Sequence, residues 1–192
     1  MSENETQRRA FWKRTRKGKV VRVVNERYIR DDVGCGYMLG SKVDAGKLVE
    51  LVQNTPSKDL LVLDTNIALQ EIDVLEYKCP ATGLVVVLQT VLQELKHLNK
   101  SVYQRIKSLI ENESMQYIFF PNELETNTAT MREHDETIND ANDRAIRHAS
   151  KHLHSFIESS GCRVVLLSED VDMQKKAKKE ELACVSMRTC FC

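Results

Sequence analysis

From residue 60 onward, short apolar runs alternate with helical patterns, and this alternation constrains the fold more than any other feature. The runs have the length of buried strands and lie at 60–63, 84–88, 117–120 and 163–167. Between them, helices are expected to begin at Thr90 and Ser101, each followed by Gln three residues on as in a capping box, and a long amphipathic helix over 139–158. This order predicts an α/β fold with a central parallel sheet and helices on both faces.

The first 59 residues predict a basic N-terminal extension that packs on the domain formed by residues 60–192. Residues 1–10 have the composition of a loose tail, residues 18–24 have strand character, and a short helix is expected near 43–53. No internal repeat or low-complexity tract interrupts the chain, so one domain with one extension accounts for its 192 residues.

Positive charge is concentrated near the N-terminus. The whole chain has 28 basic and 28 acidic side chains, yet ten basic residues and a single acid, Glu26, lie between Arg8 and Arg30. Such a stripe can neutralise RNA phosphates, although a partner-protein contact or a plain solvated surface remains an alternative. The candidate RNA-binding residues are Arg14, Arg16, Lys17, Lys19 and Arg144.

Acidic residues follow the predicted strands at positions where ligands bind in parallel sheets. Asp64 comes directly after the first strand and Asp170 three residues after the last, both at carboxyl ends. Glu94 lies in the first turns of the helix after the second strand. Because ligands of open α/β sheets bind beyond the carboxyl ends of the strands, these three acids are expected at one crevice.

The long helix carries two further acids, of which one suits the crevice better. Its apolar stripe consists of Ala145, Ile146, Ala149, Leu153 and Phe156. At about 100° per residue, Asp143 lies roughly 110° from the centre of the stripe and Asp140 about 170°. Asp143 therefore borders the buried face, and Asp140 is expected to point to solvent.

Four carboxylates in one crevice repel each other unless a hard cation neutralises them. Mg²⁺ and Mn²⁺ prefer such oxygen ligands, and a pair of ions about 3.5–4 Å apart supports phosphodiester hydrolysis. Each acid also has a structural interpretation. Asp64 and Asp170 can cap helices, Glu94 can be a surface residue, and Asp143 can pair with Arg147.

Other kinds of site are less well supported. The second residue after Asp64 is Asn66, which excludes an Asp-x-Asp phosphatase motif, and His148 and His152 are expected on a solvated face because no HExxH motif is present. The six cysteines include no CxxC pair and no secretory leader precedes them, which indicates free thiols in a reducing compartment. The tail cysteines Cys184, Cys190 and Cys192 match no zinc spacing.

Five stretches of the sequence form one set of motifs. They are Tyr28-Ile-Arg-Asp-Asp-Val-Gly-Cys35-Gly36, Leu61-Val-Leu-Asp64-Thr-Asn66, Gln70-Glu-Ile-Asp-Val-Leu-Glu76, Val87-Leu-Gln-Thr-Val-Leu-Gln-Glu94 and Ile138-Asn-Asp-Ala-Asn-Asp143-Arg-Ala-Ile-Arg147. In this order they resemble the PIN domain at the N-terminus of the RNase II/R-type catalytic ribonuclease subunit of the eukaryotic RNA exosome. The resemblance implies an endoribonuclease for single-stranded RNA, acting in rRNA processing and RNA decay in the nucleus, the nucleolus included, and the cytoplasm. It also implies that one or two Mn²⁺ or Mg²⁺ ions are held by catalytic Asp64, Glu94, Asp143 and Asp170.

The sequence departs from the family pattern in two places. The usual Thr-Asn-Asp-Arg after the last strand is Ser168-Glu169-Asp170-Val171 here. Of the family's three-cysteine and histidine cluster, which supports attachment to the exosome core, only Cys35 remains, and Phe156 stands where the histidine is expected. Exosome docking is therefore expected to be weakened, and purified protein is expected to hold no zinc.

The alternative function is that of a PIN-fold interaction module that tethers a larger nuclease and contributes little chemistry. The family protein continues with cold-shock, RNase II-type and S1 domains, so the chain is expected to be its excised N-terminal domain rather than a stand-alone nuclease. No apolar run approaches the roughly 20 residues of a membrane helix, and no membrane association is expected.

Overall fold

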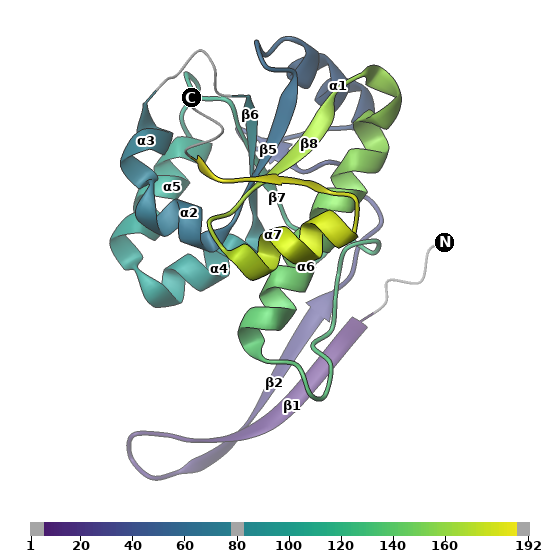
Figure 1. Ribbon diagram of the computed structural model, residues 1–192. Helices are drawn as coiled ribbons and strands as arrows, with labels where there is room; N and C mark the ends of the chain where they lie inside the picture. Colours follow the sequence, from purple (N-terminus) through teal and green to yellow (C-terminus); the bar gives the residue numbers. More distant parts are fainter. Residues whose placement is uncertain (1–5, 78–82, 188–192) are drawn as a thin grey trace.

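The computed structural model describes residues 6–77 and 83–187, and its centre is a seven-stranded sheet (Figure 1). Its strand order is β4-β3-β7-β6-β5-β8-β9. The strands are β3 (Tyr37–Met38), β4 (Ser41–Lys42), β5 (Asp59–Leu63), β6 (Leu84–Leu88), β7 (Tyr117–Phe120), β8 (Arg163–Leu167) and β9 (Ala183–Val185). The neighbouring strands β7, β6, β5, β8 and β9 are all parallel, while β3 runs antiparallel to both β7 and β4. The predicted parallel α/β sheet is thus confirmed, with an antiparallel edge added.

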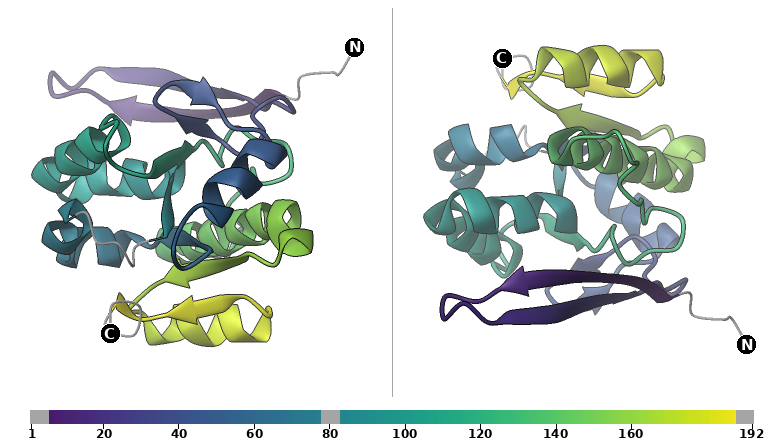
Figure 2. Two further views of the ribbon diagram at one scale, coloured as in Figure 1. Left: turned by 90° about the horizontal axis from the view of Figure 1, so that it is seen from above. Right: turned by 90° about the horizontal axis from the view of Figure 1, so that it is seen from below.

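Helices cover both faces of the sheet, as predicted. They are α1 (Ala45–Gln53), α2 (Thr65–Gln70), α3 (Ile72–Glu76), α4 (Gln89–Leu98), α5 (Lys100–Ile110), α6 (Ile138–Ile157) and α7 (Val171–Lys179). Figure 2 shows α2 to α5 on one face, α1 and α6 on the other, and α7 beside the β9 edge. A 3-10 turn, η1 (Glu158–Ser160), follows α6, and Gly161 at φ 72° ends it in the left-handed region that favours glycine.

The four predicted apolar strands are confirmed to within one residue, because β5 and β6 are buried at every position. The two predicted helix starts are also confirmed to within one residue, but the capping boxes predicted for them are wrong. Helix α4 begins at Gln89 with no side-chain cap, because the hydroxyl of Thr90 is buried and accepts a hydrogen bond from Asn122 Nδ2 at 2.9 Å. Helix α5 is capped by Asn99, whose side-chain oxygen accepts from the backbone amide of Ser101.

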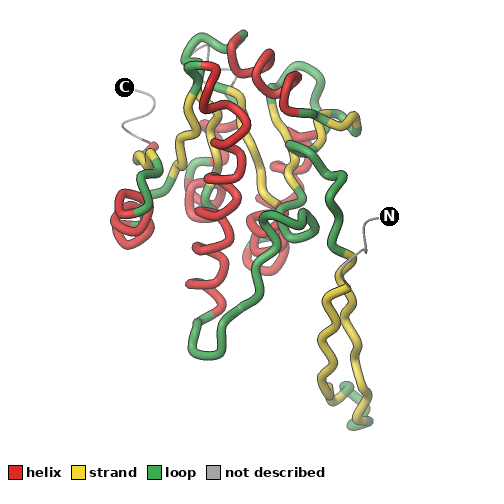
Figure 3. The backbone as a smooth tube through the Cα atoms, turned by 90° about the vertical axis from the view of Figure 1, so that its right-hand side faces the viewer, coloured by secondary structure: helices red, strands yellow, loops and turns green. Residues whose placement is uncertain are grey.

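The N-terminal segment forms a hairpin of β1 (Thr6–Arg14) and β2 (Val20–Tyr28), paired antiparallel as a separate two-stranded sheet. The prediction of a loose tail is therefore wrong for residues 6–10, which are ordered by cross-strand pairing rather than by an apolar pattern of their own. Gly18 at φ 81° allows the tight turn between the strands. Figure 3 shows the hairpin extending away from the helices and the main sheet.

The rest of the segment 1–59 shares the core of the main domain. Strands β3 and β4 belong to the main sheet, and α1 contacts α6. Gly36 lies so close to β7 that a Cβ there would come within 2.5 Å of the carbonyl oxygen of Phe119, which explains glycine at this position. Within the described ranges, no helix is long and apolar enough to cross a membrane. The buried apolar side chains of the segment 1–59 are Ile29, Val33, Cys35, Val43, Leu48 and Val52.

Candidate active site

Asp64 occupies the end of β5, where the apolar strand gives way to α2. It is the N-cap of α2, and its Oδ1 accepts a hydrogen bond from the backbone amide of Thr65 at 2.6 Å. Its Oδ2 accepts from the hydroxyl of Ser168 at 2.7 Å, at the end of the neighbouring strand β8. The side chain is buried, so both oxygens depend on these protein donors rather than on water.

Two hydroxyl groups connect Asp64 to two of the other predicted acids. The hydroxyl of Thr65 donates to Glu94 Oε2 at 2.6 Å, which brings α4 against the start of α2. The oxygen of Ser168 accepts from the backbone amide of Asp170 at 3.1 Å. Sequence reasoning did not assign roles to Thr65 and Ser168, although each directly adjoins or nearly adjoins a predicted acid.

Asp170 follows β8 and caps α7. Its Oδ1 accepts from the backbone amides of Asp172 at 2.6 Å and Met173 at 2.9 Å. The neighbouring Glu169 is turned toward the chain end, where it accepts from the amide of Met187 at 2.9 Å. Glu169, the acid by which this chain departs from the family motif, therefore has a hydrogen-bond partner of its own, away from Asp170.

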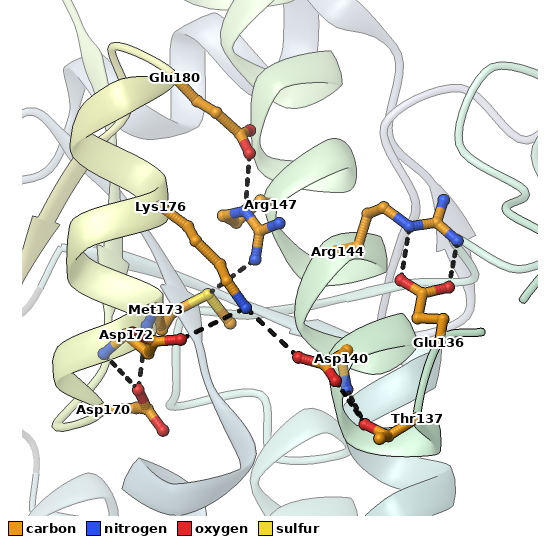
Figure 4. Close-up of polar contacts among 10 residues, drawn as sticks. All are labelled: Glu136, Thr137, Asp140, Arg144, Arg147, Asp170, Asp172, Met173, Lys176 and Glu180. Carbon is orange, nitrogen blue, oxygen red and sulfur yellow. Dashed lines mark hydrogen bonds and ion pairs between the residues drawn. The ribbon is translucent and has the colours of Figure 1, made fainter. Parts of the chain in front are cut away.

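Asp143 lies half-buried on α6 and faces the other acids. Burial, and after it the charges of Asp64 and Asp170, raise its pKa to about 6, against the opposing effect of Lys176 and Arg147. Its carboxylate has no hydrogen-bond donor within the part of the chain that the structure describes. The ion pair with Arg147 that helical spacing allows does not form, because Arg147 Nε donates to Glu180 at 2.9 Å instead (Figure 4).

Asp140 has a different environment from Asp143. Figure 4 shows it between Thr137, whose hydroxyl donates to it at 2.6 Å, and Lys176, whose ammonium group lies at 3.3 Å. These contacts lower its pKa, the Thr137 hydrogen bond most of all. Asp140 is exposed and charge-paired, whereas Asp143 is partly buried and faces like charges. This is the distinction that the helical angles predicted.

The four predicted acids form one electrostatic group. Burial is the main cause that raises the pKa of Asp64. The hydrogen bonds from Ser168 and Thr65 oppose this rise, while the charges of Glu94 and Asp170 add to it. Since Asp143 in turn interacts with Asp64 and Asp170, four side chains from four segments are brought together at the carboxyl ends of β5 and β8.

The donor set fits a divalent oxygen-binding cation. Carboxylates are the ligands that Mg²⁺ and Mn²⁺ prefer, and a cation would relieve the repulsion that adds to the effect of burial in raising the pKa values of Asp64 and Asp143. Within residues 6–77 and 83–187, no three His, Cys, Asp or Glu side chains form a ready-made ion cage. Asp64 instead satisfies its oxygens with Thr65 and Ser168.

The candidate RNA-binding residues fall into two groups. Arg14, Arg16, Lys17 and Lys19 are exposed around the turn of the β1–β2 hairpin. Arg144 is not brought to them. It is held in a two-pronged ion pair with Glu136, at 2.8 and 2.7 Å, and donates to the carbonyl of Met131. Its guanidinium group is therefore already engaged within the protein (Figure 4).

Cys35 and Phe156, which stand where the family has its cysteine–histidine cluster, are packed against other side chains. Cys35 is fully buried and its burial raises the pKa of the thiol to about 12, so it is a neutral core side chain at physiological pH. Phe156 packs edge-on against His152, with ring centres 4.8 Å apart. Of the six cysteines, Cys35, Cys162 and Cys184 lie in the described ranges and are free thiols, while Cys79, Cys190 and Cys192 lie outside them.

Comparison with known proteins defines the family to which this chain belongs. The profile of the PIN domain family matches residues 61–188, about two thirds of the chain, and the chain belongs to this family. In fold it is similar to the RRP44 PIN domain of T. brucei, with a TM-score of 0.66 over 84% of this chain and 90% of that one, at 24% sequence identity.

Among individual proteins, the chain is similar to exosome complex exonucleases. It is 38% identical to exosome complex exonuclease RRP44 of Mus musculus over 90% of the chain, and 37% identical to that of Homo sapiens over the same share. RRP44 homolog A of Arabidopsis thaliana is 36% identical over 92% of the chain. The chain spans about a fifth of the length of these relatives, 18–19% in each case. The resemblance to the PIN domain of the exosome ribonuclease is thus confirmed.

Proposed function

We propose that this chain is a metal-dependent endoribonuclease that hydrolyses phosphodiester bonds in single-stranded RNA. The observation that carries the proposal is the convergence of Asp64, Glu94, Asp143 and Asp170 from four segments. Like charges gathered at a partly buried site destabilise the fold. Their presence together is explained by a cation that binds them.

The four acids are proposed to hold one or two Mn²⁺ or Mg²⁺ ions. Such an ion, when bound, lowers the pKa of a water molecule and stabilises negative charge on a phosphate. The protein's own contribution is orientation. Thr65 fixes Glu94 and Ser168 fixes Asp64 by short hydrogen bonds, so that these carboxylates keep defined positions before any ligand arrives.

Contact with the RNA backbone is proposed for the basic hairpin. Its exposed basic residues near the turn, Arg14, Arg16, Lys17 and Lys19, can neutralise phosphates of a strand that also reaches the acids. The contribution of Arg144 is proposed to be structural, because its guanidinium group is bound to Glu136.

A second candidate function is that of an interaction module. The observation that favours it is the β1–β2 hairpin, which extends from the domain (Figure 3). On this hairpin Trp12 is 70% exposed and Tyr28 58%. Association with the RNA exosome core is proposed on the ground that the relatives are exosome subunits by name. Action in RNA processing and decay in the nucleus, the nucleolus and the cytoplasm is part of the same proposal.

The test of the proposed function is cleavage of a circular single-stranded RNA, which has no ends and can be opened only by an endonuclease. We expect opening with Mn²⁺ or Mg²⁺ and none with EDTA. The Asp143→Asn protein is the matched negative control, because it changes one oxygen to nitrogen and removes no hydrogen bond seen within the described residues. Circular RNA left intact under conditions in which linear RNA is degraded would contradict the proposal and favour the interaction module.

A further inference from the structure

A pocket of about 300 Å³ adjoins the acids between α4 and the beginning of α6. It is bordered by Glu94 on one side, so whatever occupies it lies next to the candidate active site. Its size is at the lower end of the range for small-ligand pockets. The other lining residues are Thr90, Gln93, His97, Leu98, Glu123, Ile138, Asn139 and Asn142.

The charges of the pocket disfavour a phosphate group as its occupant. The lining contains two carboxylates, Glu94 and Glu123, and neither lysine nor arginine. A phosphate would be repelled by these carboxylates, whereas an uncharged ring would not. The hairpin does supply Arg27, but its guanidinium group is used in an ion pair with Glu123 at 2.9 Å.

Two apolar side chains in the lining remain open to solvent. Leu98 at the end of α4 is 62% exposed, and Ile138 at the start of α6 is 64% exposed. Exposure of large aliphatic side chains to water raises the free energy, and covering both with the face of a flat ring would lower it. Their presence in one pocket indicates a ligand with an apolar face.

The same pocket offers unused hydrogen-bonding groups. The side-chain amides of Asn139 and Asn142 have no partner among residues 6–77 and 83–187, and each presents donors and an acceptor together. The deeper part is fixed, since Glu123 accepts from Gln93 at 3.2 Å and from Thr90 at 3.4 Å. The pocket therefore combines a fixed floor, apolar walls and free amides at its edge.

We propose that this pocket is a nucleobase subsite that holds the base of a nucleotide beside the bond to be cleaved. The base would lie against Leu98 and Ile138, and its polar edge would pair with the amides of Asn139 and Asn142, as amides pair with base edges elsewhere. The inference rests on the proposed function, because it makes the pocket part of an RNA-cleaving site. It explains how an acidic site retains RNA, since the base, not the phosphate, is what the pocket binds.

The first experiment measures binding without cleavage. The full chain, labelled at leucine and isoleucine methyl groups, is titrated in EDTA with the four nucleoside 5′-monophosphates and with ribose 5-phosphate. We expect saturable shifts at Leu98 and Ile138 with the nucleotides only, and none at Leu69 or Ile110, which lie outside the pocket. Equal shifts with ribose 5-phosphate, or none with any nucleotide, would overturn the proposal.

Variants make the assignment specific. Replacing Asn139 and Asn142 together by Ala is expected to weaken nucleotide binding about tenfold, near the lower end of what an amide paired with a base edge contributes. Gln104→Ala, an exposed amide on α5 outside the pocket, is the matched control and is expected to bind normally. Equal affinities for the double variant and the control, with both folded by circular dichroism, would remove the amides from the site.

The outcomes for the subsite and for the nuclease are separable. An RNA oligonucleotide with a single abasic position is expected to be cleaved beside that position about tenfold more slowly than the intact strand. Cleavage that ignores the missing base would refute the subsite and leave the nuclease intact. Saturable nucleotide binding in a protein that never cleaves circular RNA would refute the nuclease and leave the base pocket.

Discussion

Asp143→Asn is expected to stabilise the metal-free protein at neutral pH. The folded-state pKa of Asp143 is raised to about 6 by burial and by Asp64 and Asp170, from an ordinary value of 3.8. A raised carboxyl pKa means that the folded state binds the proton more tightly than the unfolded state does. Stability is therefore lost as pH rises from about 4 through about 6, and the loss is complete above that window. Asparagine removes the charge and hence the loss.

The size of the effect follows from the shift. About two pKa units correspond to about 3 kcal/mol at most, at about 1.4 kcal/mol per unit. Because Asp143 is only half-buried, solvent screening reduces this figure, and about 1 kcal/mol is expected. For a domain of this size that is a rise of about 2–4 °C in Tm.

The assay is denaturant unfolding of both proteins in EDTA at pH 7.5 and pH 4.5. We expect the variant to be more stable at pH 7.5 and much closer to the parent at pH 4.5, where the folded carboxyl is mostly protonated. With Mn²⁺ at 100 times its Kd, the parent is expected to gain about 2.7 kcal/mol and the variant much less, which reverses their order. A variant that is no more stable than the parent at pH 7.5 in EDTA would refute the electrostatic reasoning.

Asp140→Asn is the matched control, three residues away on the same helix. Its folded-state pKa is lowered by Thr137 and Lys176, so its stabilising effect is present above its unfolded pKa and is lost as pH falls. The control variant is therefore expected to be destabilised at pH 7.5, with the opposite sign to Asp143→Asn. The same sign for both variants would show that the two environments do not differ as described.

Further predictions concern activity, RNA binding and zinc. Asp143→Asn is expected to reduce RNA cleavage by at least about 100-fold, and Asp140→Asn by less than about tenfold, measured as initial rates in Mn²⁺. Equal losses would contradict the assignment. Replacing Arg14, Arg16, Lys17 and Lys19 by Ala is expected to flatten the salt dependence of RNA binding, by about 0.7 in log–log slope for each phosphate that the hairpin no longer neutralises. An unchanged slope would assign the hairpin to a partner protein. Elemental analysis is expected to find no stoichiometric zinc, and Cys35→Ser is expected not to change retention by the exosome core in a pull-down. About one zinc per chain, or retention abolished by that substitution, would show that the thiol still takes part in a cluster.

The fold was predictable because its central strands are buried on both faces. Runs such as those of β5 and β6 can be identified as strands from their own residues, without knowing which strand they pair with. They are almost wholly apolar, and turns or helices flank them. The hairpin strand β1 was not predictable in this way. Its first residues, Thr6 to Ala10, carry no apolar alternation, and they become a strand only through pairing such as Arg8 with Glu26 and Ala10 with Val24.

The site was predictable in its charges but not in its hydrogen bonds. Strand ends and helical angles locate carboxylates, because both depend only on position along one element. The contacts of Thr65 with Glu94 and of Ser168 with Asp64 join segments 29 and 104 residues apart, and no pattern within one element reports them. The base pocket is similar, since α4 and α6 meet only in the folded chain.

The four acids differ in what a substitution at each position would remove. Asp64 and Asp170 are helix caps as well as candidate ligands, so replacing either by Ala would remove a cap worth about 1 kcal/mol together with the charge. Asparagine caps helices as well as aspartate does, so the Asn variants at these two positions separate the cap from the charge. Asp143 and Glu94 lie on helix sides and cap nothing. Loss of cleavage without loss of stability at Asp143 and Glu94 would therefore assign the acids to chemistry, independently of any argument from the fold.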